Sequence, residues 1–257
     1  MDCHSARPYS ESARAYDLTL GIPVFLHLRR LFPALVRRYG IEFGSAADVG
    51  CGTGLFACYL SRCWGVPVFA VDISPDMLRV AARNCRGANV RLLRQDIRCL
   101  RLPCPVDLIT ANFDTLNHLV GCSDLAVALR RFRENLRPGG HLVFDLVTTC
   151  GPPAGRSRHV RRFVIGGGKM VRAIHWDPER QAFSVFVLLR SRSSPWATVE
   201  AHRERPYSPR FIARSLASAG FVIRGIHDAT TGRVAARCAP RIVVVATSTE
   251  TESCQLR

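Results

Sequence analysis

The stretch AADVGCGTGLFA, residues 46–57, places a glycine-rich loop between a short apolar run and a helix-forming segment. Its glycines Gly50, Gly52 and Gly54 follow one another at two-residue steps. A glycine-rich turn between a strand and a helix lets backbone N–H groups approach a bound ligand closely. The stretch therefore predicts a ligand site at the end of the first strand of an α/β sheet.

The spacing of the loop glycines separates the ligand classes. A dinucleotide-binding loop follows the pattern G-x-G-x-x-G, and Leu55 occupies the last glycine position counted from Gly50. A phosphate-binding Walker loop needs Gly-Lys-Ser/Thr, and the one lysine of the chain is Lys169. A nicotinamide-dependent oxidoreductase is therefore a weak alternative, and a P-loop protein is excluded.

Short apolar runs alternate with helical patterns from residue 46 to residue 148. The expected strands are SAADVG, VPVFAVDIS, VRLLRQDI, VDLITANF and HLVFDLVT, and the helices between them include LFACYLSRCW and SPDMLRVAARNC. Two further strands, FVIRGIHDA and RIVVVATS, follow a helix that begins near Pro209. This order predicts a doubly wound, mostly parallel, seven-stranded α/β sheet of Rossmann-like type, with ligands bound at the carboxyl ends of its strands.

The alternation breaks at a Pro- and Gly-rich linker, GPPAGRSRHV, and four β-rich segments follow it. They predict an antiparallel β lid inserted into the main domain. The expected division is N-terminal cap helices at 1–45, an α/β core at 46–150, the lid at 151–206, a C-terminal completion of the core sheet at 207–249 and a tail at 250–257.

The chain of 257 residues carries a formal net charge of +16, almost all of it from arginine spread along the sequence. Such a spread indicates a generally basic surface rather than a nucleic-acid-binding block. The lid arginines Arg156, Arg158, Arg161, Arg162 and Arg172 suit either a solvated face or an anionic substrate.

Cysteines and apolar runs limit the remaining classes of protein. The 11 cysteines contain no C-x-x-C pair, so we expect neither a disulfide framework nor a bound metal. The sequence alone does not exclude a metal site formed by Asp114, Asp124 and Asp145. The N-terminus lacks the apolar core of a signal peptide, and we expect that no stretch is apolar enough to span a membrane. We therefore expect a cytoplasmic protein.

Two acids follow the loop at successive strand ends. Asp72 ends the second predicted strand, where a carboxylate accepts two hydrogen bonds from ribose hydroxyls. Asp96 follows the third strand, where an adenine amino group would lie. Each acid alone is more often a helix cap. Together with the loop they indicate an adenosine ligand.

At this point the chain resembles the class I S-adenosylmethionine-dependent methyltransferases. The resemblance is strong over residues 46–148 and looser beyond, and its motifs are DVGCGTG, VFAVDIS, RQDI, LITANFDTLNHL and LRPGGHLVFD. It implies S-adenosyl-L-methionine as cofactor. The cofactor-binding residues it implies are Asp48, Gly50, Cys51, Gly52, Gly54, Asp72, Ile73, Met77, Asp96, Ile97 and Asn112.

The candidate catalytic residues are His118 and Tyr16. His118 is the only histidine near the end of the fourth strand, and an imidazole suits a base or a hydrogen-bond partner. The segment AYD, residues 15–17, matches an N-terminal Tyr-Asp pair that folds over the cofactor in similar enzymes. Sugar N-methyltransferases of the family pair such a tyrosine with a histidine, and Tyr16 with His118 fits that pairing. A structural role remains open for both.

The resulting hypothesis is methyl transfer to nitrogen or oxygen of a small molecule, by in-line displacement at the sulfonium methyl. The acceptor is interpreted as anionic, and a homodimer through the β lid is a further expectation. An RNA or protein methyltransferase is the alternative, although the strand-four motif that grips planar nitrogens is absent. The third hypothesis is a nicotinamide-dependent oxidoreductase, and the fourth is a protein that binds the cofactor without catalysis.

Overall fold

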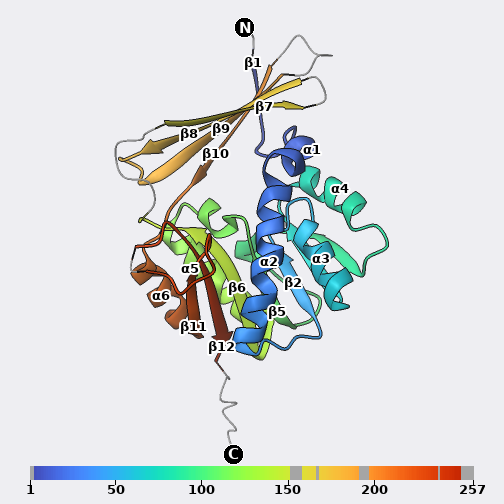
Figure 1. The fold of residues 1–257 in the computed structure, drawn as a ribbon, viewed down its shortest axis with the longest axis vertical. Helices are drawn as coiled ribbons and strands as arrows, with labels where there is room; N and C mark the ends of the chain where they lie inside the picture. Colours follow the sequence, from blue (N-terminus) through green and yellow to red (C-terminus); the bar gives the residue numbers. More distant parts are fainter. Residues whose placement is uncertain (1–2, 151–157, 166–167, 191–196, 237, 250–257) are drawn as a thin grey trace, which may run out of the picture.

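A computed structural model describes residues 3–150, 158–165, 168–190, 197–236 and 238–249. The expected tail at 250–257 and Arg156 lie outside these residues. Within them the chain forms a core domain and a separate β lid above it (Figure 1).

The core sheet has seven strands: β2 (Ala46–Val49), β3 (Val68–Asp72), β4 (Val90–Arg94), β5 (Val106–Ala111), β6 (Leu136–Val147), β11 (Phe221–Asp228) and β12 (Arg241–Ser248). Their order is β11-β12-β6-β5-β2-β3-β4, and β12 runs antiparallel to both of its neighbours. The remaining pairs are parallel. The predicted fold class is therefore confirmed, including the strand count.

Helices cover both faces of this sheet, as parallel strands require. The helices α2 (Ile22–Tyr39) and α3 (Leu55–Trp64) contribute to one buried cluster, which contains Phe32 and Leu60. The helices α5 (Cys122–Glu134) and α6 (Pro209–Ser218) contribute to the other, around Phe132 and Ile212. The helix α4 (Pro75–Asn84) begins at Ser74, whose side chain accepts a hydrogen bond from the Met77 N–H.

The lid is a five-stranded sheet of β7 (Arg158–Ile165), β8 (Gly168–Asp177), β9 (Ala182–Arg190), β10 (Ala197–Glu204) and β1 (Cys3–Ala6). Its inserted strands are antiparallel, as expected, and lie above the core (Figure 1). Strand β1 pairs in parallel with β10 and was not expected, because only helices were predicted before residue 46. Residues 3–6 are therefore part of the lid sheet.

A helical segment connects the lid to the core. It consists of α1 (Ala13–Tyr16), a π-helical turn η1 (Asp17–Gly21) and α2. Contrary to the sequence expectation, residues 13–39 are long and apolar enough to cross a membrane by length and composition alone. One face of α2 is buried in the core through Leu28, Leu31, Phe32, Leu35 and Val36. In this fold, these apolar residues of α2 pack against the core of the protein.

Candidate active site

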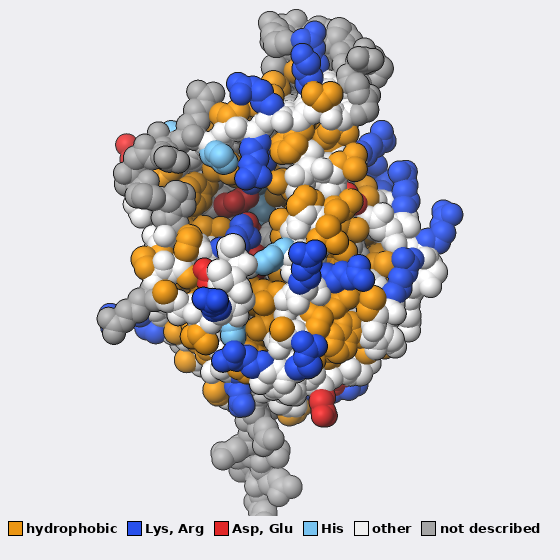
Figure 2. Space-filling model, in the orientation of Figure 1, with side chains coloured by type: hydrophobic (Ala, Val, Ile, Leu, Met, Phe, Trp, Pro, Cys, Tyr) orange, Lys and Arg blue, Asp and Glu red, His pale blue; other side chains and the backbone are white. Residues whose placement is uncertain are grey.

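A cavity of about 620 Å³ lies between the core and the lid. Its wall is formed by the glycine loop, the ends of β3 and β4, the turn η3 (Thr115–His118) after β5, and residues of β10 and the N-terminal segment. Figure 2 shows the surface hollowed below the lid, with acidic side chains inside the hollow. The volume suits a small-molecule ligand, for which sites of about 300–1,000 Å³ are usual.

The glycines of the loop have different structural tasks, although all have left-handed φ angles of +69°, +52° and +78° for Gly50, Gly52 and Gly54. A Cβ on Gly50 would lie 2.3 Å from Thr115 Oγ1, and one on Gly54 would lie 2.9 Å from Cys85 Sγ. A Cβ on Gly52 would meet no protein atom within 4 Å. Gly50 and Gly54 thus permit close packing of the protein, whereas Gly52 leaves room in the cavity wall.

Asp72 is fixed at the cavity by backbone donors. Its Oδ2 accepts a hydrogen bond from the Gly52 N–H and its Oδ1 one from the Ser74 N–H, both at 2.8 Å. Burial raises the pKa of Asp72, and these N–H groups oppose the rise. The neighbouring Ile73 is 61% exposed and lines the cavity beside Met77. A hydrogen-bond acceptor and an apolar surface therefore stand together, as an adenosine requires.

Asp96 has a charged partner, Arg98, which was not predicted. It caps the short turn η2 (Ile97–Cys99) by accepting a hydrogen bond from the Arg98 N–H at 2.8 Å. The Arg98 guanidinium lies 2.6 Å from Asp96 Oδ2, and it lowers the pKa of the carboxyl. Asp96 lines the cavity, but its carboxylate is already paired with the Arg98 guanidinium.

Eight of the residues predicted to bind cofactor line the cavity: Gly50, Cys51, Gly52, Asp72, Ile73, Met77, Asp96 and Ile97. Three others, Asp48, Gly54 and Asn112, are not in its wall. Asp48 is 2% exposed and accepts a hydrogen bond from Thr110 Oγ1 at 2.8 Å. Burial raises its pKa to about 7. Asp48 therefore lies buried behind the glycine loop and does not face the cavity.

The segment AYD fastens the N-terminus to the glycine loop through its aspartate. Asp17 accepts a hydrogen bond from Thr53 Oγ1 at 2.5 Å and one from Asn84 Nδ2 at 3.0 Å. Tyr16, the residue before it, lines the cavity. The N-terminal segment thus closes one side of the cavity, as the resemblance implied.

The tyrosine that contacts His118 is Tyr9. Its hydroxyl lies 3.2 Å from His118 Nε2, whereas Tyr16 meets the Tyr9 ring edge-on at a centroid distance of 5.9 Å. Among the described residues, no hydrogen bond joins Tyr16 to His118; the tyrosine bonded to His118 is Tyr9, and the catalytic role of Tyr16 stays a prediction. Burial raises the pKa values of both tyrosines.

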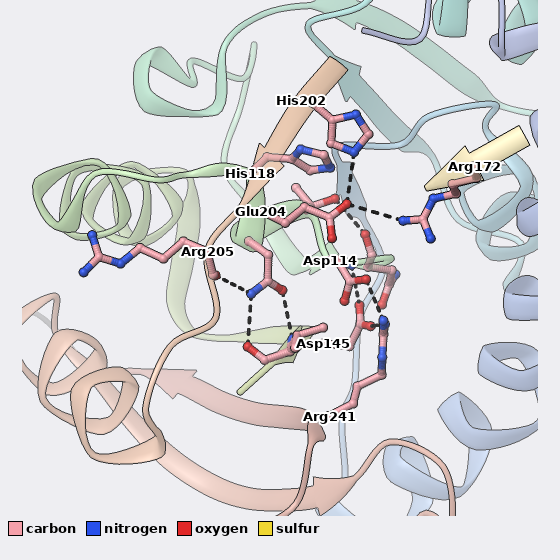
Figure 3. Close-up of polar contacts among 12 residues, drawn as sticks. Asp114, His118, Asp145, Arg172, His202, Glu204, Arg205 and Arg241 are labelled. Carbon is pink, nitrogen blue, oxygen red and sulfur yellow. Dashed lines mark hydrogen bonds and ion pairs between the residues drawn. The ribbon is translucent and has the colours of Figure 1, made fainter. Parts of the chain in front are cut away.

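Polar side chains of the lid, His202, Glu204 and Arg172, gather beside His118 (Figure 3). His202 Nε2 is 3.2 Å from the Tyr9 hydroxyl and 3.0 Å from Glu204 Oε1. Arg172, on β8, lies 3.7 Å from the same Glu204 oxygen. Arg172 was among the lid arginines expected to meet either solvent or an anionic substrate. His202 and Glu204 were not predicted for the site, although they are two apart on a strand and so share a face.

Burial and charge set the protonation of this group. Burial, assisted by His202, lowers the pKa of His118 to about 4, so His118 is neutral at pH 7. Burial would raise the pKa of Glu204, but the hydrogen bond from His202 and the nearby His118 and Arg172 lower it to about 2. The site therefore combines a neutral imidazole with an ionised carboxylate.

The acids Asp114 and Asp145 are held by an arginine. Arg241 Nη2 lies 2.6 Å from Asp114 Oδ2, and its Nη1 lies 2.7 Å from Asp145 Oδ2 (Figure 3). Burial raises the pKa of Asp114 to about 7, against the effect of Arg241. A guanidinium thus already supplies the positive charge that these two acids require.

Part of the chain is similar to known proteins. Residues 46–140 match the model of the methyltransferase domain. A dTDP-3-amino-3,6-dideoxy-alpha-D-glucopyranose N,N-dimethyltransferase of Streptomyces fradiae is 35% identical over 112 residues, which are 44% of this chain and 43% of that protein. A dTDP-3-amino-3,4,6-trideoxy-alpha-D-glucopyranose N,N-dimethyltransferase of Streptomyces venezuelae is 30% identical over 43% of this chain and 46% of that protein.

Solved structures are similar over nearly the whole chain. An S-adenosylmethionine-dependent methyltransferase from Clostridium acetobutylicum superimposes with a TM-score of 0.80 at 22% identity, covering 94% of this chain and 99% of that one. The CcbJ methyltransferase from Streptomyces caelestis has a TM-score of 0.77 at 22% identity, over 95% and 98% of the two chains. At such identities the likeness establishes the fold, lid included.

These findings support a class I S-adenosylmethionine-dependent methyltransferase. The predicted sheet is thereby confirmed, the match over residues 46–140 agrees with the predicted family and cofactor, and neither amino-sugar relative favours the RNA or protein alternative. The chain matches only about half the length of the curated relatives named above.

Proposed function

We propose that the protein transfers a methyl group from S-adenosyl-L-methionine to the amine nitrogen of a small molecule, with a hydroxyl oxygen as the second choice. The observation that carries this proposal is the cavity itself, which joins the loop around Gly52 and Asp72 to the polar group of Tyr9 and His118. The names of the two amino-sugar relatives support the choice of nitrogen.

The cavity wall fits the proposed cofactor. When bound, S-adenosyl-L-methionine supplies an electrophilic methyl group on a sulfonium. Asp72 offers carboxylate lone pairs to ribose hydroxyls, and Ile73 with Met77 offers an apolar surface to adenine. Gly52 keeps space for a methionine portion, since no protein atom lies within 4 Å of a Cβ placed there. Cys51, Asp96 and Ile97 complete the proposed contacts, and Asp48, Gly54 and Asn112 are assigned to supporting them.

The chain's own contribution to catalysis is orientation and exclusion of water. An amine attacks as its neutral form, so the site must hold its lone pair in line with the methyl group. His118 is neutral above its pKa of about 4 and therefore does not repel a sulfonium or an amine. Tyr16 and the N-terminal segment cover the reacting groups. Alignment is worth several kcal/mol, so a strong base is not required.

Two arginines support an anionic acceptor. Arg7 and Arg203 are exposed and line the cavity at the lid side. A guanidinium binds phosphate oxygens in a bidentate manner. The two amino-sugar relatives are named for dTDP-linked sugars. We therefore propose an amino sugar linked to a nucleoside diphosphate as the acceptor class. Arg172, among the predicted lid arginines, faces Glu204 instead.

The test uses methyl-13C-labelled S-adenosyl-L-methionine and three acceptors. They are dTDP-3-amino-3,6-dideoxyglucose, the same amino sugar without its nucleotide, and the dTDP sugar with a hydroxyl at carbon 3. The proposal expects N-methyl product from the first, at least tenfold less from the second and little from the third. Label that enters only RNA or protein of a cell lysate would overturn it.

Other properties keep the status of predictions. They are a homodimer through the β lid, the lack of a nucleic-acid partner, the lack of a membrane association and a cytoplasmic location. Sedimentation of the purified chain at several concentrations tests the first.

A further inference from the structure

We propose that Glu204 and His202 fix the direction of the Tyr9 hydroxyl hydrogen, so that the Tyr9 oxygen presents a lone pair to an N–H or O–H of the methyl acceptor. Tyr9 is then the residue that orients the acceptor, and the two lid residues are positioning residues. This inference rests on the proposed function, because it concerns the acceptor end of the same cavity.

The direction of the hydrogen-bond chain follows from its far end. An ionised carboxylate can only accept hydrogen bonds. Glu204 Oε1 lies 3.0 Å from His202 Nε2, so that nitrogen carries the hydrogen. The Tyr9 oxygen lies 3.2 Å from the same nitrogen and accepts a share of this hydrogen in a three-centre arrangement.

Among the described residues, the Tyr9 hydroxyl hydrogen then has one remaining acceptor. His118 Nε2 lies 3.2 Å from the Tyr9 oxygen, so Tyr9 donates to it. His118 must carry its own hydrogen on Nδ1 in that arrangement. Its Nε2 lone pair is occupied, which leaves the Tyr9 oxygen as the hydrogen-bond acceptor that this group offers to a ligand.

Three residues of the hydrogen-bond chain face the cavity and the fourth does not. Tyr9, His118 and His202 line the cavity, whereas Glu204 is 9% exposed and lies outside its wall. Glu204 therefore acts through His202 and Tyr9, and the charged neighbour Arg172 holds its carboxylate from β8. Asp114 and Tyr16 are the other titratable groups whose charges act on Tyr9.

The same donor atoms suggest one competing explanation. His118, His202 and Glu204 place two nitrogens and one oxygen within 4.8 Å of one another, a donor set that zinc accepts. In the structure each of these atoms has a hydrogen-bond partner among Tyr9, His202 and Glu204, which favours the chain of hydrogen bonds.

The first test reads the histidine tautomers by 15N NMR of the purified wild-type protein, without any acceptor. The proposal expects hydrogen on Nδ1 of His118 and on Nε2 of His202. Hydrogen on Nε2 of His118 would overturn it. One equivalent of zinc in the purified protein, lost in Glu204→Gln, would also overturn it. Because this test needs no turnover, it stands even if the proposed methyl transfer fails.

The second test measures methyl transfer to dTDP-3-amino-3,6-dideoxyglucose and S-adenosylhomocysteine affinity in parallel. Glu204→Gln offers His202 a hydrogen donor and so removes the fixed direction. It should lower kcat/KM for the acceptor about tenfold, as the loss of a charged hydrogen bond implies, with cofactor affinity unchanged. His202→Leu should match it, and His202→Gln, which keeps an N–H, should recover part of the activity.

The controls are exposed residues of the lid. Glu179→Gln and His159→Leu alter the same residue types away from the cavity and should leave kcat/KM unchanged. Melting temperatures of all variants separate unfolding from loss of orientation. Wild-type kcat/KM in Glu204→Gln, or equal loss in His202→Gln and His202→Leu, would overturn the proposal.

Discussion

Glu200, on the lid strand β10, accepts a hydrogen bond from the backbone N–H of Tyr9 at 3.0 Å while only 1% exposed. The same carboxylate accepts hydrogen bonds from the N–H groups of Glu11 and Ser12, at 2.6 Å and 2.9 Å. Tyr9 has a φ of +60°, which is rare for a residue with a side chain. The lid therefore holds the N-terminal segment in the conformation in which Tyr9 meets His118.

Removing the charge of Glu200 should release this segment. In Glu200→Gln an amide replaces one acceptor oxygen, so one or more N–H groups of residues 9–12 lose their partner. Such a loss costs about 1–3 kcal/mol. We expect a melting temperature several degrees lower and faster amide hydrogen exchange at residues 9–12. Exchange as slow as in the exposed control Glu179→Gln would contradict this function of Glu200.

Two loop glycines should respond differently to alanine. Gly50→Ala places a Cβ against Thr115, at 2.3 Å from its Oγ1, whereas Gly52→Ala meets no protein atom within 4 Å. We expect Gly50→Ala to lower the melting temperature of the free protein by several degrees more than Gly52→Ala. Gly52→Ala should instead weaken S-adenosylhomocysteine binding. Equal melting temperatures would show that the loop relaxes around Thr115.

The two strand-end acids should contribute unequally to cofactor affinity. Asp72 is held by backbone N–H groups and has lone pairs to offer, whereas Asp96 is already paired with Arg98. Asp72→Asn should weaken S-adenosylhomocysteine binding about tenfold or more. Asp96→Asn should weaken it only a few-fold in the same calorimetric titration. The reverse order would mean that Arg98 leaves Asp96 when the ligand binds.

Asp48 makes stability depend on pH. Its pKa is about 7 in the folded chain against an ordinary value of 3.8, chiefly because it is buried. A raised pKa stabilises the fold below pH 3.8 relative to higher pH, and this contribution is lost as pH rises through 7. Asp48→Asn keeps an oxygen for the Thr110 hydroxyl and carries no charge. The stability of the wild type relative to this variant should fall between about pH 4 and pH 7 and then level off. Parallel melting curves over that range would contradict the raised pKa.

The core of the site was predictable because its signals are local. The glycine loop, Asp72 and the order of strands are all readable from short patterns; the sheet confirmed the strand order, and Asp72 lies against the loop through the Gly52 N–H. The partner of Asp96 also has a local signal, since Arg98 follows two residues later in the sequence.

The acceptor end of the site was less predictable because its contacts join distant segments. Tyr9 meets His118 and His202 across separations of 109 and 193 residues, and no local pattern connects them. The tyrosine nearer to the helix, Tyr16, matched the family pattern, and the positive φ of Tyr9 that turns it toward His118 has no sequence signature. The one available signal was the pair His202 and Glu204, two polar residues on one face of a lid strand.

Asp72 and the glycine loop are expected to bind an S-adenosyl-L-methionine type of cofactor in the cavity. Calorimetric titrations with S-adenosylhomocysteine and with NAD, on the wild type and on Asp72→Asn, decide whether they do. We expect one S-adenosylhomocysteine site per chain, weakened in Asp72→Asn, and no NAD binding. Binding of NAD without binding of S-adenosylhomocysteine would contradict it.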